Sequence, residues 1–242
     1  LVSWLADWPW AVWQQAHPDH SAGTSVRYRA LLMSAVRTGC AAAKVPAPDL
    51  QAVEAEKGER LVYLTEQERT TLLKAYSPHA AAPVLLLAYQ GMRTQEVLQL
   101  DWLEVDFPNE TIRVNSARAK SRKARAVPMH PRVAMLLWGM WHAAGKPQRG
   151  HVFISSRGAP YSDTQDEGGN PLRKPHETAC RKAKVSGFRV HDWRHDWAAR
   201  CVMSGMDLFT LMRLGGWSSL AMVERYASVT AHHMRDAIKR VA

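Results

Sequence analysis

Cysteine is scarce in this sequence, with three residues among 242. Cys40, Cys180 and Cys201 lie far apart and none belongs to a CxxC pair, so neither a disulfide framework nor a zinc ribbon is predicted. Apolar runs long enough to cross a bilayer are also missing, as is a recognisable secretory signal, so we expect no membrane contact. Few and separated thiols are typical of a cytoplasmic protein, which is the location we expect.

Recognisable nucleotide and metal motifs are missing as well. The sequence contains no Walker loop, no GxGxxG string and no HExxH string. Its carboxylates are not grouped as in a metal-dependent nuclease, and His232 and His233 taken with His195 make no known metal pattern. We therefore expect no metal ion, no cofactor and no small-molecule substrate.

Acidic residues are outnumbered by basic ones, 22 against 32, which gives a formal net charge of +10. A protein this basic usually binds a polyanion, and nucleic acid is the commonest one. A basic enzyme that acts on something else remains the alternative when charge alone is considered.

The composition divides the chain into two parts. Residues 1–45 have helical periodicity, and residues 46–60 carry the prolines and charges of a linker. A new unit then begins with the string Thr65-Glu-Gln-Glu68, which predicts a capping box at the start of a helix. We place the boundary between residues 57 and 58. Because the chain begins at Leu1 rather than Met, we expect a fragment of a longer protein.

In the second part the pattern predicts a small sheet among helices. Residues 103–107 and 111–114 have the alternation of a hairpin around a turn, and residues 124–128 that of a third strand. One helix is expected to open at Pro83. Further helices are expected over residues 131–144, 171–184, 191–204 and 206–214. The predicted fold class is α+β, mainly helical with a three-stranded antiparallel sheet.

Three strings contain residue types suited to chemistry at a phosphodiester. They are Tyr89-Gln-Gly-Met-Arg-Thr-Gln-Glu-Val-Leu-Gln-Leu100, His191-Asp-Trp-Arg194 and Leu214-Gly-Gly-Trp-Ser-Ser-Leu-Ala-Met-Val-Glu-Arg-Tyr226. Together they resemble the three signature boxes of the tyrosine recombinases, the phage integrase family. The resemblance covers roughly residues 61–230, so it implies the fold as well as the chemistry.

The resemblance implies a role for each residue of these strings. Tyr226 would be the nucleophile, and Arg93 and Arg194 would clamp the scissile phosphate, because a guanidinium stays charged and offers a planar donor fork. Glu96, three residues after Arg93, would orient that arginine. His191 would contact the phosphate or accept the proton of the tyrosine. Taken singly, each of these residues has an ordinary structural interpretation, such as a surface ion pair for Arg93.

A basic segment without acids, residues 117–128, precedes and includes the third strand. The resembling family has a β-turn lysine here, and the spacing favours Lys120 over Lys123. Lys120 would be the general acid toward the departing 5′ oxygen, because the pKa of a lysine can fall beside other cations. The other cations are expected to contact DNA, and they are Arg118, Arg122, Lys123 and Arg125. Without the resemblance, this segment would be interpreted as a solvated basic hairpin.

Trp217 departs from the commonest family pattern, which has histidine nine residues before the tyrosine. Indole has one N–H donor and cannot transfer protons, so an acid–base role at this position is excluded. We expect Trp217 to donate one hydrogen bond to the phosphate, with a purely structural tryptophan as the alternative. His195 follows Arg194 directly; we expect it to point elsewhere on its helix and leave it outside the catalytic set.

The resemblance implies a site-specific recombinase that cleaves and rejoins DNA through a 3′-phosphotyrosine intermediate without metal or ATP. The implied partners are duplex DNA and other copies of the chain in a tetramer. Residues 1–57 would be the C-terminal part of a helical core-binding domain with its linker, and residues 58–242 the catalytic domain. Two other functions stay open: a type IB topoisomerase-like enzyme that relaxes DNA, and a catalytically inactive DNA-binding protein of the same fold.

Overall fold

The chain divides by internal packing into two units, Leu1–Arg60 and Leu61–Ala242. The computed structural model describes residues 15–17, 19, 22–47, 62–115, 124–155, 158–161 and 170–230. In the first unit the described part consists mainly of helix α3 (Ala22–Ala42), inside the stretch predicted to be helical. The assignment of the units to a core-binding and a catalytic domain stays a prediction. In the described ranges, no helix has both the length and the apolar character needed to cross a membrane.

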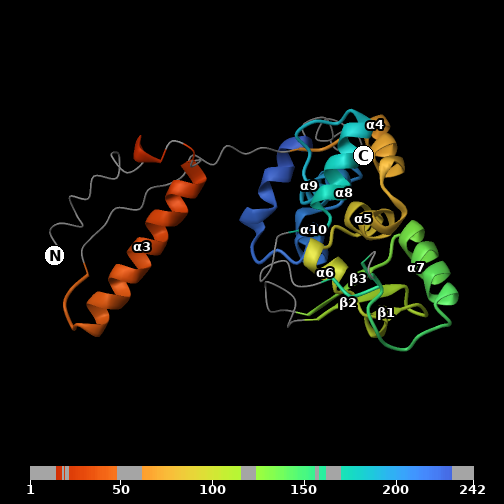
Figure 1. Cartoon of the computed structure of the whole chain (residues 1–242), viewed down its shortest axis with the longest axis horizontal. Helices are drawn as coiled ribbons and strands as arrows, with labels where there is room; N and C mark the ends of the chain where they lie inside the picture. Colours follow the sequence, from red (N-terminus) through yellow and green to blue (C-terminus); the bar gives the residue numbers. More distant parts are fainter. Residues whose placement is uncertain are drawn as a thin grey trace, which may run out of the picture. The chain divides into compact units, whose positions relative to one another are not determined.

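The second unit combines helices with one small sheet, as predicted (Figure 1). Its α-helices are α4 (Glu66–Ala75), α5 (Pro78–Gln90), α6 (Thr94–Leu98), α7 (Pro131–Ala143), α8 (Arg173–Ala183), α9 (Asp192–Met203) and α10 (Leu208–Gly215). Among the residues described in this unit, the 3₁₀ helices are η1 (Trp102–Glu104), η2 (Leu220–Met222) and η3 (Glu224–Thr230). The predicted α+β fold class is confirmed.

The sheet is antiparallel, with strand order β1 (Val105–Asp106), β2 (Thr111–Val114) and β3 (Arg125–Pro128). The predicted strand over residues 103–107 is too long, because a 3₁₀ turn occupies its first part. The Asp101 carboxylate accepts a hydrogen bond from the Leu103 N–H at 2.9 Å, and the Glu104 carboxylate accepts one from the Asp101 N–H at 3.1 Å. This local capping stabilises a turn where alternation alone predicted a strand.

Helix α5 begins at Pro78, so the prediction that it opens at Pro83 was wrong. Proline suits the first turn of a helix, where its missing N–H has no intrahelical partner, and Ser77 before it is extended. Pro83 lies in the interior and removes one backbone hydrogen bond. The helix persists because its apolar side chains, among them Leu86 and Leu87, are fully buried.

Helix α5 lies in the middle of the unit and packs against α4, α7 and α9 (Figure 1). Most buried apolar residues belong to one large cluster around this helix. A second cluster joins α9 to α10 and η3 through Trp197, Leu211, Val223 and Tyr226. The candidate nucleophile is therefore a core residue that fixes the short C-terminal helix against α9.

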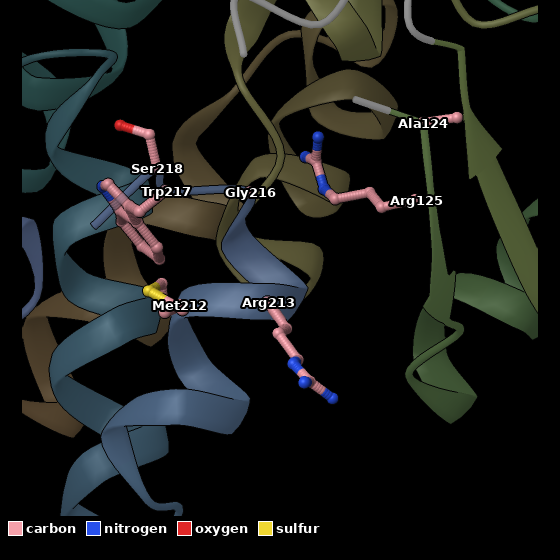
Figure 2. A pocket seen from close by; sticks show the side chains of 7 residues that line it. All are labelled: Ala124, Arg125, Met212, Arg213, Gly216, Trp217 and Ser218. Carbon is pink, nitrogen blue, oxygen red and sulfur yellow. The ribbon is translucent and has the colours of Figure 1, made fainter. Parts of the chain in front are cut away.

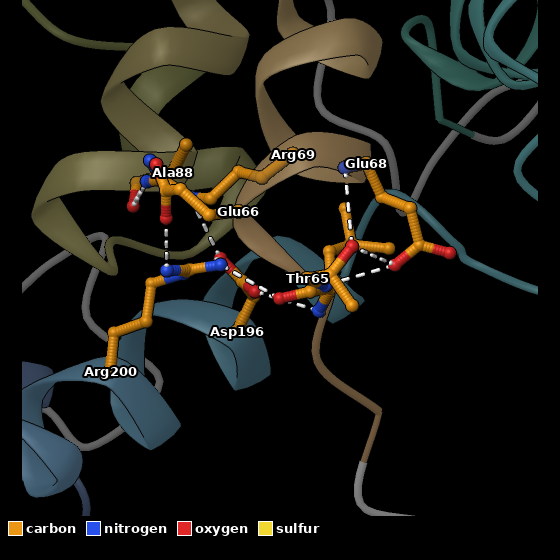
Figure 3. A network of polar contacts seen from close by, with 8 residues as sticks. Thr65, Glu66, Glu68, Arg69, Ala88, Asp196 and Arg200 are labelled. Carbon is orange, nitrogen blue, oxygen red and sulfur yellow. Dashed lines mark hydrogen bonds and ion pairs between the residues drawn. The ribbon is translucent and has the colours of Figure 1, made fainter.

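A buried carboxylate ties the start of α4 to α9 (Figure 3). Asp196 is fully buried, and its Oδ1 accepts a hydrogen bond from the Leu64 N–H at 3.0 Å. Its Oδ2 accepts from Arg69 Nε and Arg200 Nε, each at 3.0 Å. Arg200 also reaches the Leu64 carbonyl at 2.7 Å. The capping box predicted at Thr65 forms at the same place.

Replacing Asp196 with alanine is expected to lower the free energy of unfolding by about 3–5 kcal/mol, because two arginines then lose their buried counter-charge. Urea unfolding followed by tryptophan fluorescence measures this. Glu177→Ala removes the exposed partner of Arg173 and is the matched control, with an expected change below about 1 kcal/mol. Equal losses for the two variants would contradict this interpretation of the network.

Candidate active site

The first string places Arg93 through a sharp turn at the end of α5. Gly91 ends the helix in the left-handed conformation, with φ of 59°. A Cβ at this position would lie 2.0 Å from the Trp197 ring, so only glycine lets α5 end this close to α9. Arg93 follows as the N-cap of α6, and its backbone N–H donates to Glu96 Oε2 at 2.9 Å.

Glu96 is a buried carboxylate that holds two guanidinium groups. Its Oε1 accepts from Arg93 Nη1 at 2.8 Å and from Arg125 Nη1 at 3.0 Å. Its Oε2 accepts from Arg125 Nη2 at 2.6 Å. Burial alone would raise the pKa of Glu96, but the hydrogen bonds and charge of Arg125 and Arg93 hold that pKa below its ordinary value. Glu96 is thus ionised at neutral pH and contacts both arginines directly.

Arg194, on α9, is almost fully buried beneath the same region. Its Nη1 donates to the Gly91 carbonyl at 2.6 Å, and its guanidinium carbon lies 3.9 Å from the centre of the Trp217 ring. Burial, followed by the positive charge of Arg93, lowers the pKa of Arg194 to about 9. That value is still above neutral pH, so the side chain keeps its charge.

The C-terminal end of α10 is the point where the three arginines meet. The carbonyl oxygens of residues 214–216, in chain order, accept from Arg125 Nε at 3.0 Å, Arg194 Nη2 at 2.7 Å and Arg93 Nη2 at 2.8 Å. Carbonyls in the last turn of a helix lack intrahelical partners and carry partial negative charge, which favours cations. The Leu-Gly-Gly part of the third string therefore orients guanidinium groups from three separate elements.

Trp217 packs against one member of this cluster, Arg194. Its ring is nearly parallel to that of Trp197, with centroids 6.4 Å apart, and it faces the Arg194 guanidinium. A Cβ at Gly215 would lie 1.9 Å from the Trp217 ring, which explains the small residue two positions earlier. Trp217 is half-buried and packs the site. A hydrogen bond from its indole to a phosphate stays a prediction.

A pocket of about 350 Å³ opens beside the arginine cluster, between β3 and the end of α10 (Figure 2). It is lined by Ala124, Arg125, Met212, Arg213, Gly216, Trp217 and Ser218. Arg125 and Arg213 are the charged residues of this lining, and the guanidinium of Arg125 is paired with Glu96.

The predicted basic segment is described only at its end. Arg118, Lys120, Arg122 and Lys123 lie outside the described residues. Arg125 is described, and its guanidinium donates to Glu96 and to the Leu214 carbonyl. In this structure it contributes to the arrangement of the site, and direct contact of Arg125 with DNA stays a prediction.

Tyr226, on η3, is fully buried, and its hydroxyl lies 2.6 Å from Nδ1 of His195. Burial raises the pKa of Tyr226 to about 12, against the opposing charges of Arg194 and Arg225. The expectation that His195 points elsewhere was wrong. Its spacing of four residues from His191 places both on one helix face, and this signal could have found it.

The phage integrase family matches residues 51–233 of this sequence. The chain belongs to the phage integrase family.

Two curated relatives of the family illustrate the degree of similarity. The integrase of Salmonella phage P22 is 26% identical over 207 residues, covering 82% of this chain and 49% of the relative. The tyrosine recombinase XerC of Chlamydia caviae is 30% identical over 147 residues, covering 58% of this chain and 44% of the relative. The chain thus spans about half the length of these integrase-family proteins.

Solved structures of the family share the fold. An integrase of the transposon Tn1549 in complex with circular intermediate DNA has a TM-score of 0.72 at 21% identity, covering 100% of this chain and 86% of that one. The catalytic domain of bacteriophage HP1 integrase has a TM-score of 0.56 at 23% identity, covering 75% and 96%. At these identities the likeness establishes the fold, which is that of the tyrosine recombinase catalytic domain.

Among the described residues, the structure brings together five of the six that the integrase resemblance assigned to catalysis. Arg93, Arg194 and Trp217 are linked through the end of α10, and the ring centroids of Trp217 and Tyr226 lie 5.9 Å apart. His191 precedes α9, and its ring centroid lies 5.2 Å from that of His195. Lys120, the sixth, lies outside the described residues. In the same described part, no group of three or more metal-ligating side chains is present.

Proposed function

We propose that this chain is the catalytic part of a site-specific DNA recombinase. Tyr226 attacks a phosphodiester, forms a 3′-phosphotyrosine and releases a 5′ hydroxyl, and a 5′ hydroxyl from a partner duplex reverses the step. The observation that carries the proposal is the meeting of Arg93 and Arg194 at the end of α10, with Trp217 in contact with both Arg194 and Tyr226.

The chemistry required of the protein is mainly electrostatic. In phosphoryl transfer the negative charge is spread over the phosphoryl oxygens, and fixed cations stabilise it. The described hydrogen bonds account for two of the five N–H donors of Arg194, so the planar guanidinium has capacity for a phosphate. Glu96 holds Arg93 by two contacts, which reduces the reorganisation needed when a phosphate arrives.

Duplex DNA is the proposed substrate, and a tetramer is the proposed assembly. The net charge of +10 supports a polyanionic partner. Recombinases of this fold are bound to DNA in solved structures, among them XerH on its difH substrate in a post-cleavage complex, with a TM-score of 0.71. Strand exchange between two sites requires more than one protomer, which supports a multimer on DNA. A cytoplasmic location follows from the same function.

Trapping of covalent adducts tests the proposed function. A pool of duplexes with a nick near a randomised sequence is suitable, because the short fragment between the cleaved bond and the nick, which carries the new 5′ hydroxyl, diffuses away and leaves the protein attached to the 3′ phosphate. We expect adducts on a denaturing gel, and sequencing of the attached DNA gives the preferred site. If no pool yields an adduct above that of Tyr226→Phe, the function is wrong.

A plasmid assay with the same protein distinguishes a recombinase from a topoisomerase-like enzyme. Two copies of the recovered site on one plasmid should give recombinant circles, which need strand transfer between sites. Relaxation of supercoiled plasmid without recombinants would favour the topoisomerase-like alternative.

Lys120→Ala is expected to slow cleavage by roughly 10²-fold or more, if this lysine protonates the departing 5′ oxygen. A substrate with sulfur at the 5′-bridging position has a leaving group that needs little protonation. This substrate should largely restore cleavage by Lys120→Ala but not by Arg93→Ala. Lys123→Ala is the matched control. Equal restoration of the Lys120 and Arg93 variants would remove Lys120 from this role.

A further inference from the structure

The hydroxyl of Tyr226 has a specific partner that the three strings do not assign. His195 Nδ1 lies 2.6 Å from this oxygen, at hydrogen-bonding distance, and both side chains are enclosed between α9 and η3. The His195 ring is half-buried, and the phenol is fully buried. The contact therefore belongs to the folded core rather than to a mobile surface.

The surroundings of His195 keep its imidazole neutral. Burial, followed by the charge of His191, lowers the pKa of His195 to about 4. Arg194 and Arg225 act in the same direction, and Asp192 opposes them. With the imidazole proton on Nε2, Nδ1 presents a lone pair to the phenol. The pair is then arranged as a hydrogen-bond donor and a neutral base.

We propose that His195 is the catalytic base that takes the proton of Tyr226 as the tyrosine attacks DNA, an inference that rests on the proposed recombinase function. In this step the bond from Tyr226 Oη to phosphorus forms and the bond from phosphorus to the 5′ oxygen breaks. The phenolic proton passes to His195 Nδ1. The departing 5′ oxygen receives its proton from Lys120, and rejoining reverses both transfers. His191 then contacts the phosphate.

The two pKa values explain why the proton moves only during attack. In the free protein, transfer from a phenol with a pKa of about 12 to an imidazole with a pKa of about 4 is strongly uphill. A bound phosphodiester adds negative charge near Arg194 and His191, which favours the imidazolium. The developing phenolate charge also passes into the new bond to phosphorus. Without DNA, the nucleophile thus stays neutral and buried.

His195→Asn tests the role, because its amide oxygen can accept the phenolic hydrogen bond near the position of Nδ1 but cannot bind the proton. The single-turnover rate of cleavage, measured on the DNA site recovered by adduct trapping, should fall by roughly 10²-fold or more. Each protein is then prepared with a ring-fluorinated tyrosine at position 226, whose phenol is more acidic. If His195 acts as a base, the ratio of parental to variant rates should shrink by about tenfold or more with the fluorinated nucleophile.

His79→Asn, an exposed histidine in the first turn of α5, is the matched control and should cleave at the parental rate. An unchanged rate ratio with the fluorinated tyrosine would show that His195 only supports the fold, and it would overturn the inference. Parental cleavage by His195→Asn would do the same. If the parental protein forms no adduct at all, the proposed function fails first, which is a distinguishable result.

A spectroscopic readout does not depend on activity or on a destabilised variant. In the parental protein labelled with ¹⁵N-histidine, His195 should be neutral at neutral pH, with Nε2 protonated and Nδ1 hydrogen-bonded. Tyr226→Phe should shift the Nδ1 resonance of His195 alone among the histidines by the loss of that bond. A protonated Nδ1, or no shift, would contradict the geometry on which the inference rests.

Discussion

Tyr226→Phe is expected to abolish covalent protein–DNA adducts while leaving DNA affinity nearly unchanged. The substitution removes only the attacking oxygen. The aromatic ring keeps its place in the cluster with Trp197 and Val223. Loss of the hydrogen bond to His195 should cost only about 1 kcal/mol of stability. Adducts are measured on denaturing gels, and affinity by gel shift.

Tyr161→Phe is the matched control, since Tyr161 is also buried but lies in the other apolar cluster. It should give adducts at the parental yield. If Tyr226→Phe also formed adducts at that yield, another residue would have to be the nucleophile. The proposed roles of Arg194 and His195, which depend on the position of Tyr226, would then need revision.

Arg93→Ala and Arg194→Ala are each expected to slow cleavage by roughly 10²–10³-fold or more, the scale of losing one preorganised charge-stabilising donor. Each arginine is held by a backbone carbonyl at the end of α10 and is therefore already placed before DNA binds. Lysine should restore little activity at either position, because one ammonium cannot replace the planar fork. Single-turnover cleavage of the nicked substrate measures the rates.

The two arginines differ in how their loss should affect folding. Arg194 is almost fully buried, and its removal leaves the Gly91 and Gly215 carbonyls without their donor. The cleavage rate of Arg194→Ala must therefore be measured together with its thermal unfolding temperature. Arg93 is about one-fifth exposed, at 21%, which makes Arg93→Lys the cleaner test. Arg113→Ala, on the exposed face of β2, is the control. Cleavage by Arg93→Lys at the parental rate would contradict the proposal that the planar guanidinium of Arg93 donates two hydrogen bonds to the phosphate.

The sequence was sufficient to predict the fold class, most helix positions and the family, because these depend on local strings and short-range periodicity. It was not sufficient for the contacts at residues 214–216, where carbonyls of α10 accept from arginines about 20 to 120 positions away. Arg125 shows the difficulty. Its place in a basic segment predicts a DNA contact, which stays a prediction, but does not reveal the long-range pairing of its guanidinium with Glu96.

Competing capping signals near the ends of helices and strands account for the errors in the predicted boundaries. Pro83 predicts a helix start because proline favours the first turn, but Ser77 and Pro78 provide the same signal earlier in the chain. The predicted first strand is too long because Asp101 caps a 3₁₀ helix at Trp102–Glu104. His195 lies outside the three strings, and its partner Tyr226 is 31 positions further along the chain, so no local pattern links the two.

The central claim, that Tyr226 is the residue joined to DNA, can be tested by mapping the adduct. The trapped complex is digested with nuclease and trypsin, and the peptides are analysed by mass spectrometry. Trypsin releases Tyr226 in the peptide that follows Arg225 and ends at Arg235. We predict that this peptide carries the nucleotide phosphate on its single tyrosine. An adduct on any other peptide, with this one recovered unmodified, would contradict the account.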